Sequence, residues 1–187
     1  MKRKVISEIN SGSMADIAFL LLIFFLVTTT IDTDSGLFKK LPPYTDEIPV
    51  TPPVKARNVF EVLVNANNEI MVEGEPIDIS TLKEKTIEFL INPGDQENLP
   101  EFTTKNIAPF GDISVTKGII SLQNDRGTSY ETYLWVINEL TAAGNVVKDN
   151  FSMHQYNKKF DELDRSKQGA VRLAKPCIIS EAEPVDL

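Results

Sequence analysis

The sequence predicts a single transmembrane helix followed by a small exported α/β domain, in which helices pack on one face of a mixed sheet. Three features support this prediction: an apolar run nearly long enough to cross a bilayer, a proline-rich stretch after it, and a C-terminal region in which predicted strands alternate with helices. With 187 residues, the chain has room for one ordinary domain and a short appendage.

The apolar run contains the predicted transmembrane helix. Residues 17–27 are all apolar, but this run is too short to cross a bilayer by itself. Extension to residues 14–31 gives a helix of roughly 27 Å at about 1.5 Å per residue, which is long enough. The extension takes in Asp16 and three threonines, whose hydroxyls can bond back to helix carbonyls. Residues 1–13 then form a cytoplasmic leader.

A cleaved signal peptide and a buried soluble helix are the rival interpretations of this run. The basic start at residues 2–4 and the apolar core both fit a signal peptide. However, no cleavage site of the Ala-x-Ala kind follows the core, and Asp16 stands where the apolar region should begin. We therefore favour an uncleaved anchor. Its basic start keeps the N-terminus cytoplasmic, although Lys39 and Lys40 weaken the charge bias.

The carboxylate of Asp16 is the main functional candidate and the predicted proton carrier. A charged side chain near the bilayer centre costs about 2.5–3.5 kcal/mol, so such residues face protein or water and are usually functional. In a dry helix interface, loss of water favours the neutral carboxyl group, so Asp16 can alternate between two charge states. Each proton that crosses 100 mV releases about 2.3 kcal/mol, which is enough to bias a mechanical step. The structural alternative pairs Asp16 with a basic group that fixes assembly.

Helical periodicity also predicts which neighbours share the face of this carboxylate. They are Ser13, Leu20, Ile23, Val27 and Thr30. We expect this face to pack against the helices of a partner protein. The alternative is that these side chains only contact membrane lipid.

A spacer and the first half of a folded domain follow the anchor. Prolines crowd residues 32–57, which predicts an extended, semi-rigid linker. The folded domain is expected at residues 58–187 and opens with a hairpin, because two β-rich runs flank a polar turn. Thr81 begins a capping-box pattern and predicts the start of a helix. Residues 92–117, broken by three prolines, are expected to be an inserted polar loop.

The second half of the domain repeats the alternation of strand and helix. Residues 119–123 indicate a buried strand, and Thr128 begins a second capping-box pattern that opens a helix. The helical pattern is expected to resume after Gly144 and to run to about Leu163. A short strand at residues 177–180 comes last. Trp135 is expected to fill the core between helix and sheet.

Composition narrows the classes of function. The net charge of −8 and the scattered basic residues argue against binding to nucleic acid. Cys177 is the one cysteine, so the chain cannot form an internal disulfide or a cysteine-rich metal site. The sequence contains no pattern for nucleophilic catalysis, no phosphate loop and no paired metal ligands. We therefore expect a binding module rather than an enzyme, without cofactor or metal.

The order of residues around the anchor resembles the ExbD/TolR family of ion-driven motor subunits. Glu8-Ile9-Asn10 is followed six residues later by Asp16, then by the apolar run, and shortly beyond it by Leu41-Pro42. The family's frequent Thr-Pro before the anchor is replaced by Ser13-Met14, and residues 92–117 and 145–175 look longer than in compact members.

The resemblance implies a bacterial inner-membrane protein whose C-terminal domain is periplasmic. Two copies, a dimer of this chain, would sit inside a pentamer of a multi-span partner resembling ExbB or TolQ. Proton flow at Asp16 would drive rotation, and the work would pass to a TonB-like or TolA-like protein. The expected role is to energise TonB-type outer-membrane transport. The alternatives are a TolR-like subunit of an envelope-constriction motor, a flagellar-type stator subunit, and a signal-anchored periplasmic binding protein without ion conduction.

Overall fold

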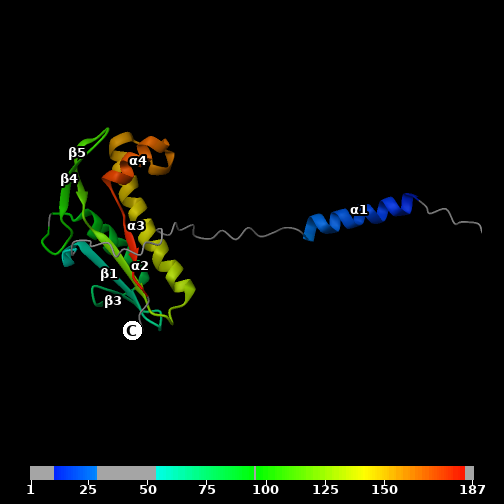
Figure 1. The fold of residues 1–187 in the computed structure, drawn as a ribbon, viewed down its shortest axis with the longest axis horizontal. Helices are drawn as coiled ribbons and strands as arrows, with labels where there is room; N and C mark the ends of the chain where they lie inside the picture. The colour runs from blue at the N-terminus through cyan, green and yellow to red at the C-terminus, as the bar shows by residue number, and fades with distance from the viewer. Residues whose placement is uncertain (1–10, 29–53, 95, 184–187) are drawn as a thin grey trace, which may run out of the picture. The chain divides into compact units, whose positions relative to one another are not determined.

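The computed structural model describes residues 11–28, 54–94 and 96–183. The chain divides into two compact units, Met1–Val50 and Thr51–Leu187, which are described separately below (Figure 1). Of the linker expected at residues 32–57, residues 32–53 lie outside the described part of the chain.

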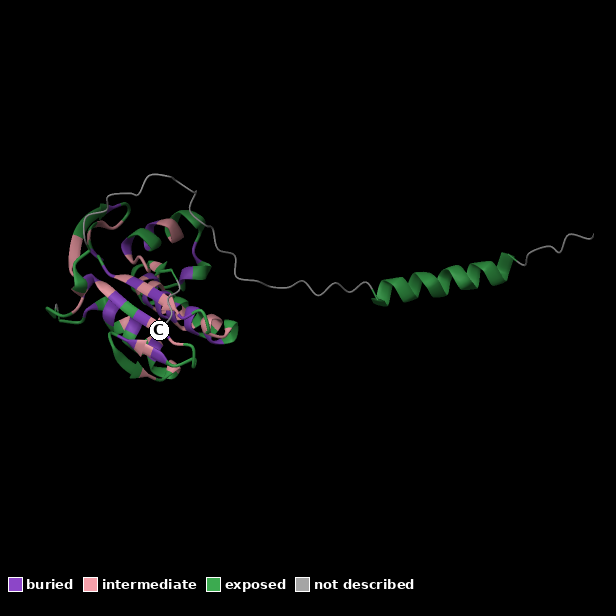
Figure 2. Ribbon diagram, turned by 60° about the horizontal axis from the view of Figure 1, so that its bottom comes forward, coloured by how far each residue is buried: buried purple, intermediate pink, exposed green. Residues whose placement is uncertain are grey.

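Within its described residues, 11–28, the first unit forms the helix α1 (Ser11–Thr28), of 18 residues. Every residue of α1 is exposed, as its uniform colour in Figure 2 shows. Its length and its mean hydropathy of 2.0 are sufficient for a membrane span. The helix takes in Ser11 to Ser13, which the sequence assigned to the leader, while residues 29–31 of the expected span lie outside the described part of the chain.

The second unit is built on a mixed five-stranded sheet with the order β3-β2-β1-β6-β7. Its strands are β1 (Val59–Val64), β2 (Ile70–Val72), β3 (Glu75–Ile77), β6 (Ile119–Asn124) and β7 (Ile179–Glu181). The pair β1–β2 is the predicted hairpin, and Asn65 shapes its turn because its Oδ1 accepts the backbone N–H groups of Asn67 and Glu69, each at 2.9 Å. By contrast, β1 runs parallel to β6, and β6 runs parallel to β7.

Helices α2 (Ile79–Ile91) and α3 (Tyr130–Tyr156) form one hydrophobic core with the sheet. In β1, Phe60, Val62 and Val64 are buried while the residues between them are not, so one face of the strand carries the core. The ring of Phe60 lies 4.9 Å from the ring of Phe89 on α2. This arrangement confirms the predicted fold class, an apolar helix followed by a mixed sheet with helices.

Both helices begin close to the expected residues, but with different caps. Helix α2 begins at Ile79 because Asp78 is its N-cap and accepts the N–H of Ser80 at 2.8 Å, so the expected start at Thr81 is wrong. Helix α3 begins at Tyr130, and Ser129 rather than Thr128 accepts the capping N–H, from Thr132. Each first turn keeps a side-chain acceptor for its free N–H groups.

The sequence predicted an interruption of the helix at Gly144, but α3 runs through this residue without a break. It continues to Tyr156 and ends at Asn157, which adopts the left-handed conformation with φ 53°. A short 3₁₀ turn, η2 (Phe160–Glu162), and a separate helix, α4 (Arg165–Ala174), follow it. The expected end of the helical pattern near Leu163 is therefore wrong, and α4 was not predicted.

The expected polar loop at residues 92–117 contains a hairpin, β4 (Phe102–Ile107) and β5 (Gly111–Thr116). This hairpin packs on α4, and the residues that join them are Ile107, Val115, Ala170 and Ala174, with Phe110 and Phe151 at the margin. The two segments that looked long in the sequence thus pack together. We call β4, β5, η2, α4 and the C-terminal half of α3 the second lobe, and its hairpin and α4 lie at the top of the folded unit in Figure 1.

Candidate functional site

Asp16 is the one ionisable side chain in α1. It is the sixth of the 18 residues of this helix, so the carboxylate lies roughly 18 Å along the axis from Thr28. Gly12, Ser13 and Ala15 lie within one turn of it. Small residues at these positions allow another helix backbone to come close to the carboxylate.

The unbroken helix determines which side chains share the face of Asp16. At 3.6 residues per turn, Ser13, Leu20, Ile23 and Val27 all project within about 60° of Asp16. Thr30, the last residue of the expected face, lies outside the described residues. The packing of this face against partner helices stays a prediction.

Near the other end of the helix, Thr28 satisfies its own hydroxyl. Its Oγ1 donates to the carbonyl of Phe24 at 2.8 Å. Because lipid offers no hydrogen-bond partner, this back-bonding is the arrangement that a threonine at the end of a span requires. Asp16 differs from Thr28, because lipid cannot satisfy its charged carboxylate, which needs water or a polar group beside it.

The folded unit presents a second candidate surface around Trp135. The side chain of Trp135 is 53% exposed, so the expectation that it fills the core is wrong. Tyr133, Ile137 and Leu140 form the apolar stripe of α3 that packs in the core. At about 100° per residue, Trp135 lies roughly 200° from Tyr133, on the far side of α3 from this stripe. Helical periodicity in the sequence could therefore have placed Trp135 outside the core.

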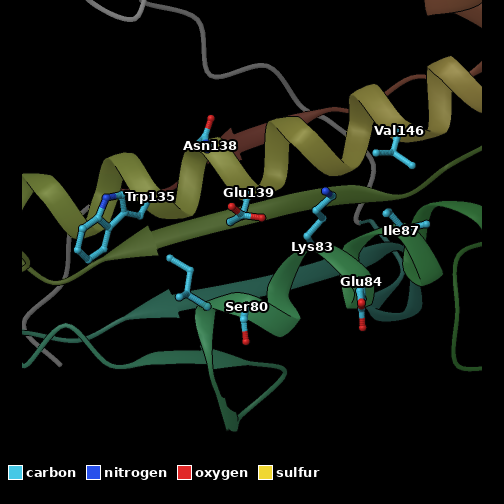
Figure 3. A pocket seen from close by; sticks show the side chains of 9 residues that line it. Ser80, Lys83, Glu84, Ile87, Trp135, Asn138, Glu139 and Val146 are labelled. Carbon is cyan, nitrogen blue, oxygen red and sulfur yellow. The ribbon is translucent and has the colours of Figure 1, made fainter. Parts of the chain in front are cut away.

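Trp135 borders a hollow of about 840 Å³ between α2 and α3. Figure 3 shows Lys83 on α2 pointing toward α3, Ser80 and Glu84 on α2 pointing away from it, and Trp135, Asn138 and Glu139 on α3. A second hollow of about 530 Å³ lies beside it, and Ile79 and Trp135 line both. An exposed aromatic side chain beside a hollow is a feature that protein-binding surfaces often have.

Neither a cluster of metal ligands nor a reactive cysteine is found among the described residues. No three of the described His, Cys, Asp and Glu side chains come together as possible metal ligands. Burial raises the pKa of the Cys177 thiol, which disfavours the reactive thiolate. Asp125 shapes the turn before α3, because its Oδ1 accepts the N–H of Gly127 at 2.6 Å.

A helix of span length with a single carboxylate, joined to a small mixed α/β domain, defines a single-pass membrane protein with one folded extramembrane domain. The family described as Biopolymer transport protein ExbD/TolR matches residues 2–148. The chain belongs to the ExbD/TolR family, which confirms the resemblance seen around Asp16. A comparison with curated proteins finds no match.

Family membership supports a subunit that energises biopolymer transport, with membrane-protein partners of the ExbB/TolQ and TonB/TolA kinds. The family match ends within α3, at residue 148. Therefore η2, α4 and β7 lie beyond the matched part of the chain.

Proposed function

We propose that this protein is an ExbD-like subunit of a proton-driven motor that energises a TonB-type outer-membrane transport system. The observation that carries the proposal is the single carboxylate of Asp16 within an otherwise uncharged helix of span length. A family of biopolymer transport proteins that matches most of the chain supports it.

Asp16 would act by changing its charge during each step. The ionised carboxylate needs water or a polar group of the partner protein, whereas the neutral carboxyl can pass an apolar wall. Ser13, Leu20, Ile23 and Val27, which share its helix face, would form the surface that slides on the partner. Proton entry on one side and exit on the other then give the motion a direction.

The remaining parts of the proposal follow from this role. The basic leader keeps the N-terminus in the cytoplasm of a bacterium, and the folded unit lies in the periplasm. Two copies of the chain sit within a pentamer of the ExbB/TolQ-like partner. The folded unit passes the work to a TonB/TolA-like protein, so the role is mechanical rather than catalytic.

The substitution Asp16→Asn tests the proton-carrying role, because it keeps the shape of the side chain and removes its charge. We expect normal expression and normal co-purification with the multi-span partner, but loss of proton-dependent outer-membrane uptake. Asp34→Asn, beyond the expected span, is the matched control and should retain uptake. Wild-type uptake in Asp16→Asn refutes the proposal, and loss of the complex assigns Asp16 a structural role instead.

Cysteine cross-linking tests the proposed helix face. In a Cys177→Ser background, Ile23→Cys or Val27→Cys should cross-link to cysteines placed in the partner helices. Phe25→Cys, about 180° around the helix from Asp16, is the control and should not. Equal cross-linking from both faces would contradict the proposed interface.

A further inference from the structure

Charge is unevenly distributed over the folded unit. Residues 145–178 carry seven Lys and Arg side chains against four Asp and Glu, although the whole chain has a net charge of −8. Residues 59–91, which form β1 to β3 and α2, carry seven acidic side chains against two basic ones. Residues 145–178, which contain the helical part of the second lobe, are therefore basic in an otherwise acidic protein.

The basic residues gather at the end of the unit where the chain enters it. Strands β1, β6 and β7 are parallel, so their N-terminal ends all lie at the same end of the sheet. At that end, Lys55 and Lys117 form ion pairs with Glu101 at 2.6 and 3.3 Å, and Arg57 Nε donates to the carbonyl of Leu99 at 3.0 Å. The hairpin β4–β5, which α4 covers, extends from the same end.

Most cations of residues 145–178 lack a carboxylate partner within the described residues, although Lys148 donates to Asn145 Oδ1 at 3.3 Å. Within the described residues, six of the seven cations of residues 145–178 make no ion pair, and Lys167, which pairs with Asp164 at 3.1 Å, is the exception. The six are Lys148, Lys158, Lys159, Arg165, Arg172 and Lys175.

Several of these side chains cover the aromatic core of the lobe. Lys148 and Arg172 lie over the ring of Phe160 at 5.7 and 5.4 Å, and Lys175 lies over the ring of Phe151 at 5.5 Å. The charged group of each of these side chains lies against an aromatic ring, and Arg172 remains exposed. Burial lowers the pKa of Lys175, so its ammonium group is only partly solvated. Leu173 stands among them and is 64% exposed. Unpaired cations around an exposed apolar side chain are typical of a surface that binds a lipid interface.

We propose that the second lobe binds the anionic headgroups of the bilayer that holds α1. The lobe is positive where the chain enters the unit, and the acidic strands and α2 are unsuited to such a surface. Attraction from several Lys and Arg side chains adds up near an anionic membrane and falls within a Debye length of it. The inference rests on the membrane anchoring of α1, but not on proton transfer by Asp16.

The experiment uses the full chain in lipid nanodiscs. A fluorophore on Ser166→Cys in α4, in a Cys177→Ser background, reports approach to a nitroxide quencher attached to lipid headgroups. A second label on Asn67→Cys, in the exposed turn between β1 and β2, is the distal control. Discs of phosphatidylcholine alone are compared with discs of equal parts phosphatidylcholine and phosphatidylglycerol.

We expect quenching at position 166 in the anionic discs, little at position 67, and loss of quenching at high salt. The pair Lys159→Gln and Arg165→Gln should lower the ratio of bound to free lobe about fivefold for each cation removed. The matched pair Lys83→Gln and Lys85→Gln on α2 should leave the ratio unchanged. Asp16→Asn should leave it unchanged too, which separates this inference from the proposed proton role.

Equal quenching in neutral and anionic discs, or at both labels, would overturn the proposal. So would unchanged quenching in the Lys159→Gln and Arg165→Gln pair. If that pair instead lost retention on purified peptidoglycan while its lipid quenching stayed normal, the basic surface would belong to a cell-wall contact rather than to a membrane contact.

Discussion

Gly144 lies directly against Cys177: a Cβ at position 144 would be 2.7 Å from the sulfur and 2.8 Å from the Cβ of the cysteine. The contact brings the middle of α3 onto the segment that leads into β7. A glycine in a helix usually costs stability, yet here it permits a close approach between two elements of the fold.

Gly144→Ala should therefore destabilise the folded unit by about 1–3 kcal/mol, because overpacking outweighs the gain in helix propensity. Urea unfolding of the full chain in detergent, followed by Trp135 fluorescence, measures the change. Gly169→Ala on α4 is the control, since nothing lies within 4 Å of its added Cβ, and it should be neutral or stabilising by up to about 1 kcal/mol. An equal loss in both variants would contradict the role given to Cys177.

Trp135→Ala should change stability by about 1 kcal/mol or less, because half of its side chain already contacts solvent. Phe89→Ala, at 1% exposure in the core, should cost about 3–5 kcal/mol. Far-ultraviolet circular dichroism gives both unfolding curves without using the tryptophan as a probe. A large loss in Trp135→Ala would show that this side chain packs inside the fold.

Alkaline pH should loosen the contact between α3 and β7. Tyr133 donates its hydroxyl to Glu181 Oε1 at 3.0 Å, and burial together with this carboxylate raises the pKa of Tyr133 to about 12. The unfolded chain therefore loses this proton first, and stability should fall as pH rises from about 10 to about 12. Tyr133→Phe should remove most of this fall in stability at alkaline pH. Tyr130 is 70% exposed, so Tyr130→Phe should show the same fall as the wild type.

Acidic pH should lower the stability of the folded unit through Glu101, near the N-terminal ends of β1 and β6. Lys55 and Lys117 hold the pKa of Glu101 below its usual range, so the native state binds this proton less readily than the unfolded chain. Its stabilising contribution is present above the unfolded pKa and is lost as pH falls through the folded pKa. Glu101→Gln should therefore reduce the loss of unfolding free energy at acidic pH, while Glu97→Gln should leave this loss unchanged. Identical acid limbs in the wild type and Glu101→Gln would contradict this assignment.

The sequence was sufficient for features that depend on composition and local periodicity. The apolar run around Asp16 and the turn between two β-rich runs each predicted their element correctly. Asp16 itself stood out because a carboxylate within an apolar run is costly. The family match then confirmed the resemblance on which the expected partners rest.

Features that depend on distant packing were missed. Strand β4 has a single buried residue, Ile107, so it lacks the alternation that identifies a half-buried strand. Ile107 packs against Ala170 and Ala174 of α4, a contact that the sequence of β4 alone does not show. The sequence could not show that Cys177 lies next to Gly144, so the glycine looked like a helix break. The basic second lobe, in contrast, was visible in the charge count of residues 145–178 and could have been found there.

The parallel pairing of β1, β6 and β7 also determines how the fold would resist mechanical load. The chain arrives at the edge where β1 begins and leaves β7 at the opposite edge of the same sheet. Tension between these two points runs along the strands and stretches their hydrogen bonds in shear, all at once rather than one after another. A subunit with this topology can transmit a pull without unzipping.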